Sequence, residues 1–91
     1  MKYIIILSVE ADKDAKELKH NEPKAYGKFL KLLLELQDHP YTGTGHPKQL
    51  GKNRQGQWSR RITHKHRLIY EIKESTITVL VLSAYGHYDD K

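Results

Sequence analysis

The first hydrophobic run of the chain is short and dense in β-branched residues. Residues 3–7 read Tyr-Ile-Ile-Ile-Leu, which predicts a buried β-strand. Ser8 follows at once and can cap a helix. Because Ala11, Ala15 and Leu18 recur at helical spacing after it, a first helix with one apolar face is expected.

A second helical pattern begins a few residues later. Asn21 is the expected N-cap, and Pro23 lies in the first turn, where a missing N–H costs little. The apolar positions that follow at helical spacing are Ala25, Phe29, Leu32, Leu33 and Leu36. Pro40 ends this pattern. The two helices are therefore expected to form a hairpin whose apolar stripes need a sheet to cover them.

The hydrophobic period changes to two after residues 41–57, a glycine-rich stretch that is expected to be loop with a short strand at 48–50. The residues expected to face one way are Trp58, Arg60, Ile62, Leu68, Tyr70 and Ile72. Those expected to face the other way are Ser59, Arg61, Thr63, Arg67, Ile69 and Glu71. Turns are expected at 64–65 and 73–75, and the apolar residues 76–82 predict a central strand.

The predicted elements follow one another in the order β-α-α-β-β-β. This order favours an α+β fold, with two N-terminal helices packed on a small antiparallel sheet. With 91 residues, the chain is expected to form one domain over residues 1–91.

Composition narrows the classes of protein further. The sequence contains no cysteine, so disulfides and thiolate zinc sites are excluded. The longest apolar stretches, residues 3–7 and 77–82, are too short to cross a bilayer. A soluble, cytoplasmic protein without membrane contact is expected.

The charge of the chain is uneven. Sixteen Lys and Arg against eleven Asp and Glu give a net charge of +5. Residues 48–67 contain no acid but carry Lys48, Lys52, Arg54, Arg60, Arg61, Lys65 and Arg67. Such a stretch attracts phosphate, and nucleic acid is its commonest partner. The alternative is a solvated basic face.

Metal-free RNA cleavage needs three kinds of group. A proton acceptor activates the 2′-hydroxyl, a fixed cation stabilises the charge that builds on the phosphate, and a donor protonates the leaving 5′-oxygen. His87 is the candidate donor, because it follows the last apolar strand and an imidazolium can donate near neutral pH. The alternative is a surface histidine in a terminal tail.

Arg67 is the candidate cation, since its strand neighbours alternate away from it and a guanidinium fork suits phosphate oxygens. Arg61 has the same parity on the preceding strand. The alternative is a pair of solvated arginines beside Glu71, which contribute little energy.

Aromatic and histidine side chains offer further chemistry. Tyr41, Tyr85 and Tyr88 could stack on RNA bases. His64 and His66 could approach a metal together, but no Asp, Glu or Cys lies nearby in the sequence to complete a specific site. Neither a metal nor a cofactor is expected.

Four segments of the sequence occur together in a recognisable order and spacing. They are Gly43-Thr-Gly-His-Pro-Lys-Gln-Leu50, Gly56-Gln-Trp-Ser-Arg-Arg-Ile-Thr63, His66-Arg-Leu-Ile-Tyr70 and His87-Tyr88. In this combination the chain resembles the YoeB/Txe branch of the RelE/ParE toxin superfamily, the toxins of bacterial toxin–antitoxin modules. The N-terminal half shares only the strand-helix-helix plan.

The resemblance implies a RelE-like microbial RNase fold and a type II toxin that inhibits translation. Such a toxin cuts mRNA in the ribosomal A site by attack of the 2′-hydroxyl, without a metal. The partners it implies are a YefM/Axe-like antitoxin, the ribosome with its mRNA, and a second copy in a homodimer. DNA would be contacted only through the antitoxin complex.

The resemblance also assigns roles to residues. Arg67 matches the family's phosphate-stabilising arginine, His87 its proton donor and Tyr88 the terminal tyrosine near the substrate. Arg61 belongs to an Arg-Arg pair near the RNA backbone. The residues expected to bind RNA are Arg61, Lys52, Arg60 and Arg54.

Lys48 departs from the family pattern, in which a glutamate at this position is the proposed proton acceptor. A protonated lysine can stabilise the 2′-oxyanion, and a lysine crowded by cations loses its proton more readily and can act as a base. His46 is the other candidate acceptor. Asp89 and Asp90, beyond the usual end, would favour the charged form of His87.

Two other functions stay open at this point. One is a protein of the same fold that binds RNA or ribosomes and cuts weakly, which Lys48 favours. The other is a toxin that poisons DNA gyrase, a function that occurs on related folds.

Overall fold

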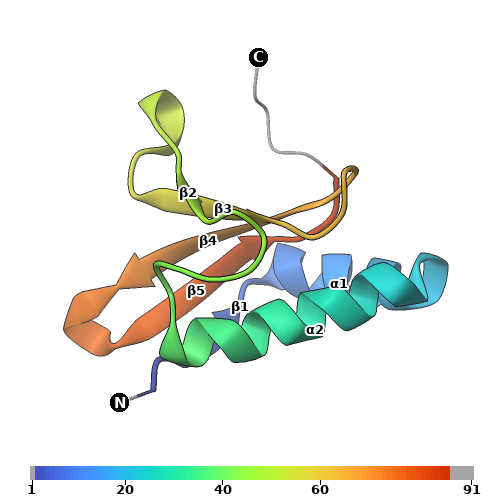
Figure 1. The fold of residues 1–91 in the computed structure, drawn as a ribbon, viewed down its shortest axis with the longest axis horizontal. Helices are drawn as coiled ribbons and strands as arrows, with labels where there is room; N and C mark the ends of the chain where they lie inside the picture. The colour runs from blue at the N-terminus through green and yellow to red at the C-terminus, as the bar shows by residue number, and fades with distance from the viewer. Residues whose placement is uncertain (1, 87–91) are drawn as a thin grey trace.

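The computed structural model describes residues 2–86, without the side chain of Lys52. In chain order the elements are β1 (Ile4–Leu7), α1 (Val9–Asn21), α2 (Pro23–Asp38), β2 (Lys48–Gln49), the 3-10 helix η1 (Lys52–Arg54), β3 (Gln57–Arg61), β4 (Arg67–Lys73), the 3-10 helix η2 (Glu74–Thr76) and β5 (Thr78–Ser83). The two helices lie side by side and pack along one side of a twisted sheet (Figure 1). The α+β fold is therefore confirmed.

The sheet has five strands in the order β1-β5-β4-β3-β2. β2 to β5 form an antiparallel meander, as predicted, and β5 lies inside the sheet. β1 pairs with β5 in parallel, so the sheet is mixed: one parallel pair is added at the edge of the predicted antiparallel meander. The two helices return the chain across one face before the meander begins, and its last strand then runs beside β1 in the same direction.

Ser8 is the N-cap of α1, as predicted. Its Oγ accepts a hydrogen bond from the backbone N–H of Ala11 at 3.0 Å and donates one to the carbonyl of Leu82 at 2.9 Å. A cap of this kind stabilises a helix by about 1 kcal/mol. The same side chain ties the start of α1 to β5.

The boundary between the helices lies one residue later than predicted. Asn21 is the last residue of α1, and its side chain donates a hydrogen bond to Glu17 at 2.7 Å. Glu22, not Asn21, precedes α2, so the prediction that Asn21 caps the second helix is wrong. Pro23 occupies the first helical position, as predicted.

The core fills the space between the helices and one face of the sheet. Its buried side chains are Ala11, Ala15, Leu18, Ala25, Phe29, Leu32, Leu36, Ile62, Leu68, Tyr70, Val79, Val81 and Ala84. Each large apolar side chain in such a core contributes about 1.5–3 kcal/mol. No helix among residues 2–86 is long and apolar enough to cross a membrane.

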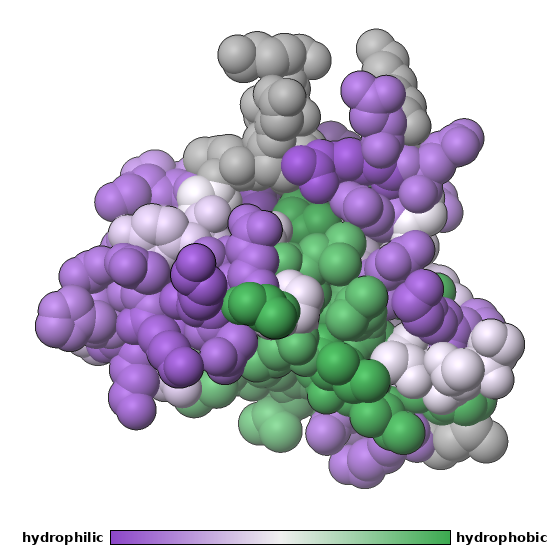
Figure 2. Space-filling model, turned by 180° about the vertical axis from the view of Figure 1, so that it is seen from behind, coloured by the Kyte–Doolittle hydropathy of each residue, from purple (hydrophilic) through white to green (hydrophobic). Residues whose placement is uncertain are grey.

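The opposite face of the sheet is not covered by the helices. On β1 the side chains alternate, and Ile4 and Ile6 are 60% and 47% exposed while Ile5 and Leu7 pack against the core. Figure 2 shows a hydrophobic area bordered by hydrophilic residues on the side of the molecule turned away from Figure 1. We call the uncovered face the open face; it is apolar on β1 and basic where β3 ends and β4 begins, at Arg61 and Arg67.

Candidate active site

The β3–β4 hairpin places the two predicted arginines opposite each other. Arg61 and Arg67 are paired across the two strands, and the next pair along the hairpin is Arg60 with Leu68. Directly opposed residues share a face of the sheet. Since Leu68 is in the core, the Arg61–Arg67 pair lies on the open face. Two like charges so close are unfavourable unless an anion lies between them.

β2 adds a third cation to this face. Lys48 is paired with Ser59, so its side chain lies on the same face as Arg61, and it is exposed. The prediction of a short strand near residues 48–50 is confirmed. Lys48 therefore lies diagonally across the sheet from Arg67, within the same basic surface.

The loop before β2 lies tightly against β3. The carbonyl of Gly45 accepts a hydrogen bond from the backbone N–H of Arg61 at 2.6 Å. Gly45 has a φ of +89°, and a Cβ there would lie 2.9 Å from the carbonyl oxygen of Arg61. Only glycine allows this approach. It places the exposed His46, the other candidate acceptor, beside the arginine hairpin.

Arg60 lies in the interior and not on the open face. Its exposure is 0%, and its guanidinium donates to acceptors within the protein. The acceptors are the Tyr70 hydroxyl at 3.0 Å, Glu35 Oε1 at 2.8 Å and the carbonyls of His39, Thr42 and Thr44 at 2.5, 2.8 and 3.3 Å. The prediction that Arg60 binds RNA is contradicted by this burial, because no donor is left for a phosphate. The sequence contained a signal of this burial, because Arg60 and Ile62 are two residues apart and therefore lie on the same face of the extended chain.

Glu35 completes the Arg60 cluster. It accepts hydrogen bonds from the backbone N–H and the hydroxyl of Thr44, both at 2.7 Å. Partial burial raises the pKa of the Glu35 carboxyl, but the hydrogen bonds from Thr44 and the charge of Arg60 outweigh it and lower the pKa. Burial raises the pKa of Tyr70, against the effect of Arg60. These contacts hold the loop between α2 and β2, which contains His46.

The C-terminal end of the described chain meets this hairpin at Arg67. The backbone N–H of Arg67 donates to the carbonyl of Gly86 at 3.0 Å. His87 and Tyr88 lie outside the described residues, but His87 follows Gly86 directly in the sequence. The structure thus brings Arg61, Arg67 and the residue before His87 to one end of the sheet.

His66 and Asp14 hold this C-terminal segment, a role that was not predicted for either residue. His66 is buried, and its Nδ1 accepts a hydrogen bond from the N–H of Gly86 at 2.7 Å. Asp14 on α1 accepts from the N–H groups of Ala84 and Tyr85 at 2.9 and 3.3 Å. A signal for Asp14 existed, since it interrupts the apolar stripe of α1 with a carboxylate.

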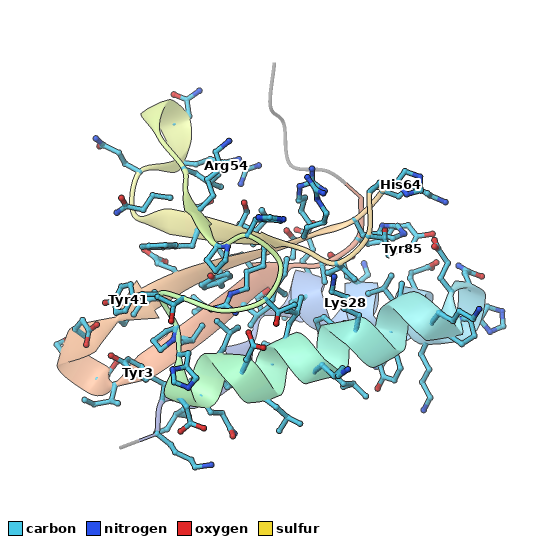
Figure 3. The ribbon with its side chains drawn as sticks, in the orientation of Figure 1. Tyr3, Lys28, Tyr41, Arg54, His64 and Tyr85 are labelled. Carbon is cyan, nitrogen blue, oxygen red and sulfur yellow. The ribbon has the colours of Figure 1, made fainter. Side chains whose placement is uncertain are left out.

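The remaining candidates are spread over the molecule. Tyr85 packs against the ring of His66, with centroids 4.5 Å apart. Tyr41 instead bonds to Glu74, at the end of the sheet away from Tyr85 and His64 (Figure 3). Tyr41 and Tyr85, two of the residues expected to stack on RNA bases, therefore do not lie in one site. The hydrogen bond to Glu74, and to a smaller extent burial, raises the pKa of Tyr41 to about 12.

Lys52 and Arg54 belong to η1, above β2 and β3 (Figures 1 and 3). Nη1 of Arg54 donates to the side chain of Gln57 at 3.0 Å. The side chain of Lys52 is outside the described part of the chain. Among residues 2–86, no group of three His, Cys, Asp or Glu side chains could hold a metal ion.

The arrangement is that of an anion-binding surface. Arg61 and Arg67 offer planar forks to one phosphate, Lys48 adds a point charge nearby, and the chain leads directly from Gly86 to a histidine. Cations held on strands are positioned more firmly than cations on loops.

Fold and site together define a RelE-like α+β domain. The family model described as "YoeB-like toxin of bacterial type II toxin-antitoxin system" matches residues 7–88, and the chain belongs to this family. It is thus a toxin of the type II kind, and the resemblance seen in the sequence is confirmed.

Several relatives agree with this membership. Toxin YoeB of Escherichia coli (strain K12) is 31% identical over 84 residues, which are 92% of this chain and 98% of that protein. The YoeB/ParE toxin from Agrobacterium tumefaciens has a TM-score of 0.88 at 26% identity and covers 93% of this chain and 99% of its own. The YoeB dimer from Staphylococcus aureus has a TM-score of 0.82 at 31% identity and covers 97% and 100%.

Proposed function

We propose that this protein is a ribosome-dependent, metal-free mRNA endoribonuclease that cuts in the A site and inhibits translation in the cytoplasm. The observation that carries the proposal is the Arg61–Arg67 pair on the open face, joined through the Arg67 backbone to the residue before His87. Family membership supports the same activity.

Each group has one step in the proposed reaction. The 2′-hydroxyl loses its proton and its oxygen attacks the adjacent phosphorus, while the bond to the 5′-oxygen breaks. Arg67 stabilises the charge on the phosphorane, and Arg61, Lys52 and Arg54 hold the RNA backbone. His87 gives a proton to the 5′-oxygen as it leaves, and Tyr88 packs beside the substrate.

The proton acceptor in this scheme is Lys48 or His46. Lys48 lies on the open face with the arginines, whereas His46 lies on the loop that Gly45 holds against β3. A lysine that stays protonated contributes by stabilising the developing 2′-oxyanion instead.

The experiment is cleavage of a defined mRNA on purified ribosomes. The wild-type protein is expected to give cuts at the A-site codon, and His87→Ala is expected to lose them, because the leaving oxygen is no longer protonated. His64→Ala is the matched control, since His64 is exposed on the β3–β4 turn and has no role in the scheme. Normal cutting by His87→Ala would overturn the assignment.

A second candidate function is a protein of the same fold that occupies RNA or the ribosome and cuts weakly. Lys48 in the position of the family's glutamate favours it. Lys48→Glu separates the two functions, because a large gain in cleavage shows that the natural protein lacks an effective base. Unchanged or reduced cleavage supports Lys48 as a working part of the site.

We also propose that a YefM-like antitoxin binds this chain and that the chain can form a homodimer. The S. aureus relative has been solved both as a YoeB dimer and as a YoeB–YefM complex. Here the exposed side chains of Ile4, Ile6 and Val9 form an apolar area that a partner can cover. Light scattering of the chain alone, and mixed with a YefM-type antitoxin, measures both associations; a monomer in both samples would contradict the proposal.

A further inference from the structure

The His66 ring is buried with a partner on each nitrogen. Its exposure is 2%. Nδ1 lies 2.7 Å from the backbone nitrogen of Gly86, and Nε2 lies 2.7 Å from Oε2 of Glu22, the residue before α2. The ring therefore links Glu22, before α2, to Gly86, the last described residue. Gly86 lies 20 residues after His66 in the sequence.

These two contacts define the protonation state of the ring. The Gly86 amide can only donate, so Nδ1 carries a lone pair and the proton is on Nε2. Nε2 then donates to the Glu22 carboxylate. This hydrogen bond, with the charge of Lys65 3.6 Å away, lowers the pKa of Glu22, which keeps the acceptor ionised against its partial burial. A carboxylate that orients a histidine in this way selects one tautomer.

The segment before His87 is held on several sides. The carbonyl of Gly86 accepts from the Arg67 N–H, and the Tyr85 ring packs on His66. Asp14 accepts from the two preceding amides. Gly86 has a φ of +79°, a left-handed backbone that favours glycine. The position of Gly86, the last described residue, is therefore set by its contacts with His66 and Arg67.

We propose that His66 is a positioning residue for cleavage: by accepting the Gly86 amide, it holds the residue before His87 beside Arg67. The inference rests on the proposed function. His66 touches neither the substrate nor the reacting atoms in this scheme. It acts through one backbone hydrogen bond, and Glu22 acts on His66 in turn.

Two substitutions separate positioning from simple packing. In His66→Asn the side-chain oxygen falls near the place of Nδ1, so the Gly86 acceptor is kept and the Glu22 contact is lost. In His66→Gln the side-chain nitrogen reaches the place of Nε2, so the Glu22 contact is kept and the Gly86 acceptor is lost. Both variants remove the same ring, so a packing role predicts similar losses in both.

The experiment measures kcat and KM for mRNA cleavage on ribosomes, with the thermal midpoint as a check on folding. His66→Gln is expected to lower kcat roughly tenfold or more with little change in KM, because misplacement of a catalytic group acts on the chemical step. His66→Asn is expected to keep kcat within about threefold of the wild type. His64→Asn, an exposed neighbour on the same turn, is the control. Equal kcat losses in Asn and Gln variants would overturn the inference.

A second measurement does not depend on activity. In wild-type protein labelled with ¹⁵N, the Gly86 amide is expected to show a coupling across its hydrogen bond to Nδ1 of His66, and its hydrogen exchange should be slow. Exchange should speed up in His66→Gln but not in His66→Asn. A fast-exchanging Gly86 amide without that coupling in the wild type overturns the positioning role. If the wild type cuts no mRNA, the proposed function fails instead, and the amide data still test the contact.

Discussion

Arg60 and Arg61 are neighbours on β3 with opposite surroundings. Arg60 is fully buried and donates to Glu35, Tyr70 and backbone carbonyls, whereas Arg61 is exposed on the open face opposite Arg67. Strand alternation alone separates them. A count of basic residues therefore says little about function until each residue is assigned to a face of the sheet.

The largest effect is expected on the open face, in Arg67→Ala. Loss of a fixed cation at the phosphorane should reduce the cleavage rate by about 10²–10³-fold. Its side chain donates a hydrogen bond from Nη1 to the Thr63 carbonyl, four residues earlier, at 3.2 Å, and loss of this local bond should change stability little. Single-turnover cleavage on ribosomes measures the rate, with Lys19→Ala, an exposed lysine of α1, as the charge-matched control. An Arg67→Ala rate within a few fold of the wild type would remove Arg67 from the reaction.

The next effect is expected in the interior, in Arg60→Ala. This change leaves Glu35 with a missing partner and several carbonyls without donors, which costs about 3–5 kcal/mol in the free energy of unfolding. Urea unfolding measures it, and Arg61→Ala, one residue along the same strand, is the matched control. If both variants unfold at the same urea concentration, Arg60 contributes no more to the free energy of unfolding than Arg61, which contradicts the prediction.

A smaller effect is expected in Arg61→Ala on RNA binding. Removal of one phosphate contact should weaken binding to ribosomes programmed with mRNA and reduce the dependence of log affinity on log salt by about one unit. Stability should stay within about 0.5 kcal/mol of the wild type, as for an ordinary surface change. Binding titrations at three salt concentrations measure the slope. A slope equal to that of the wild type would show that Arg61 makes no phosphate contact.

The smallest effect concerns Glu35 and acid. Because the pKa of Glu35 is lower in the folded protein than its ordinary value of 4.5, the unfolded state binds the proton more tightly. The stability that Glu35 contributes is present above pH 4.5 and is lost as the pH falls through the folded value. Urea unfolding between about pH 6 and pH 3 should show a shallower decline in Glu35→Gln than in the wild type. Glu10→Gln, an exposed residue of α1, should leave the decline unchanged.

Local patterns in the sequence predicted most of the fold. The Ser8 cap, the apolar stripe of α2 and the alternation from Trp58 to Ile72 depend on neighbours within a few residues, and each is confirmed. The parallel pairing of β1 with β5 depends on where the two helices return the chain, which no local pattern encodes.

The candidate site was predictable in part for the same reason. Strand parity placed Arg61 and Arg67 on one face, and the register confirms this placement. The partners of Arg60, and the contact of His66 with Gly86, join residues 10 to 25 apart in the sequence. Such contacts follow from tertiary packing. Roles for His87 and Tyr88 stay predictions, since these residues are outside the described part of the chain.

In the proposed reaction, the RNA is cut by attack of its own 2′-hydroxyl, with catalysis by a basic sheet face and a terminal histidine. The most direct test is the mass of the upstream mRNA fragment after cleavage on ribosomes. We expect a 2′,3′-cyclic phosphate at its 3′ end, and no cleavage when the nucleotide at the cut carries a 2′-deoxyribose. A 3′-hydroxyl end, or cleavage of the deoxy-substituted mRNA at the normal rate, would contradict it.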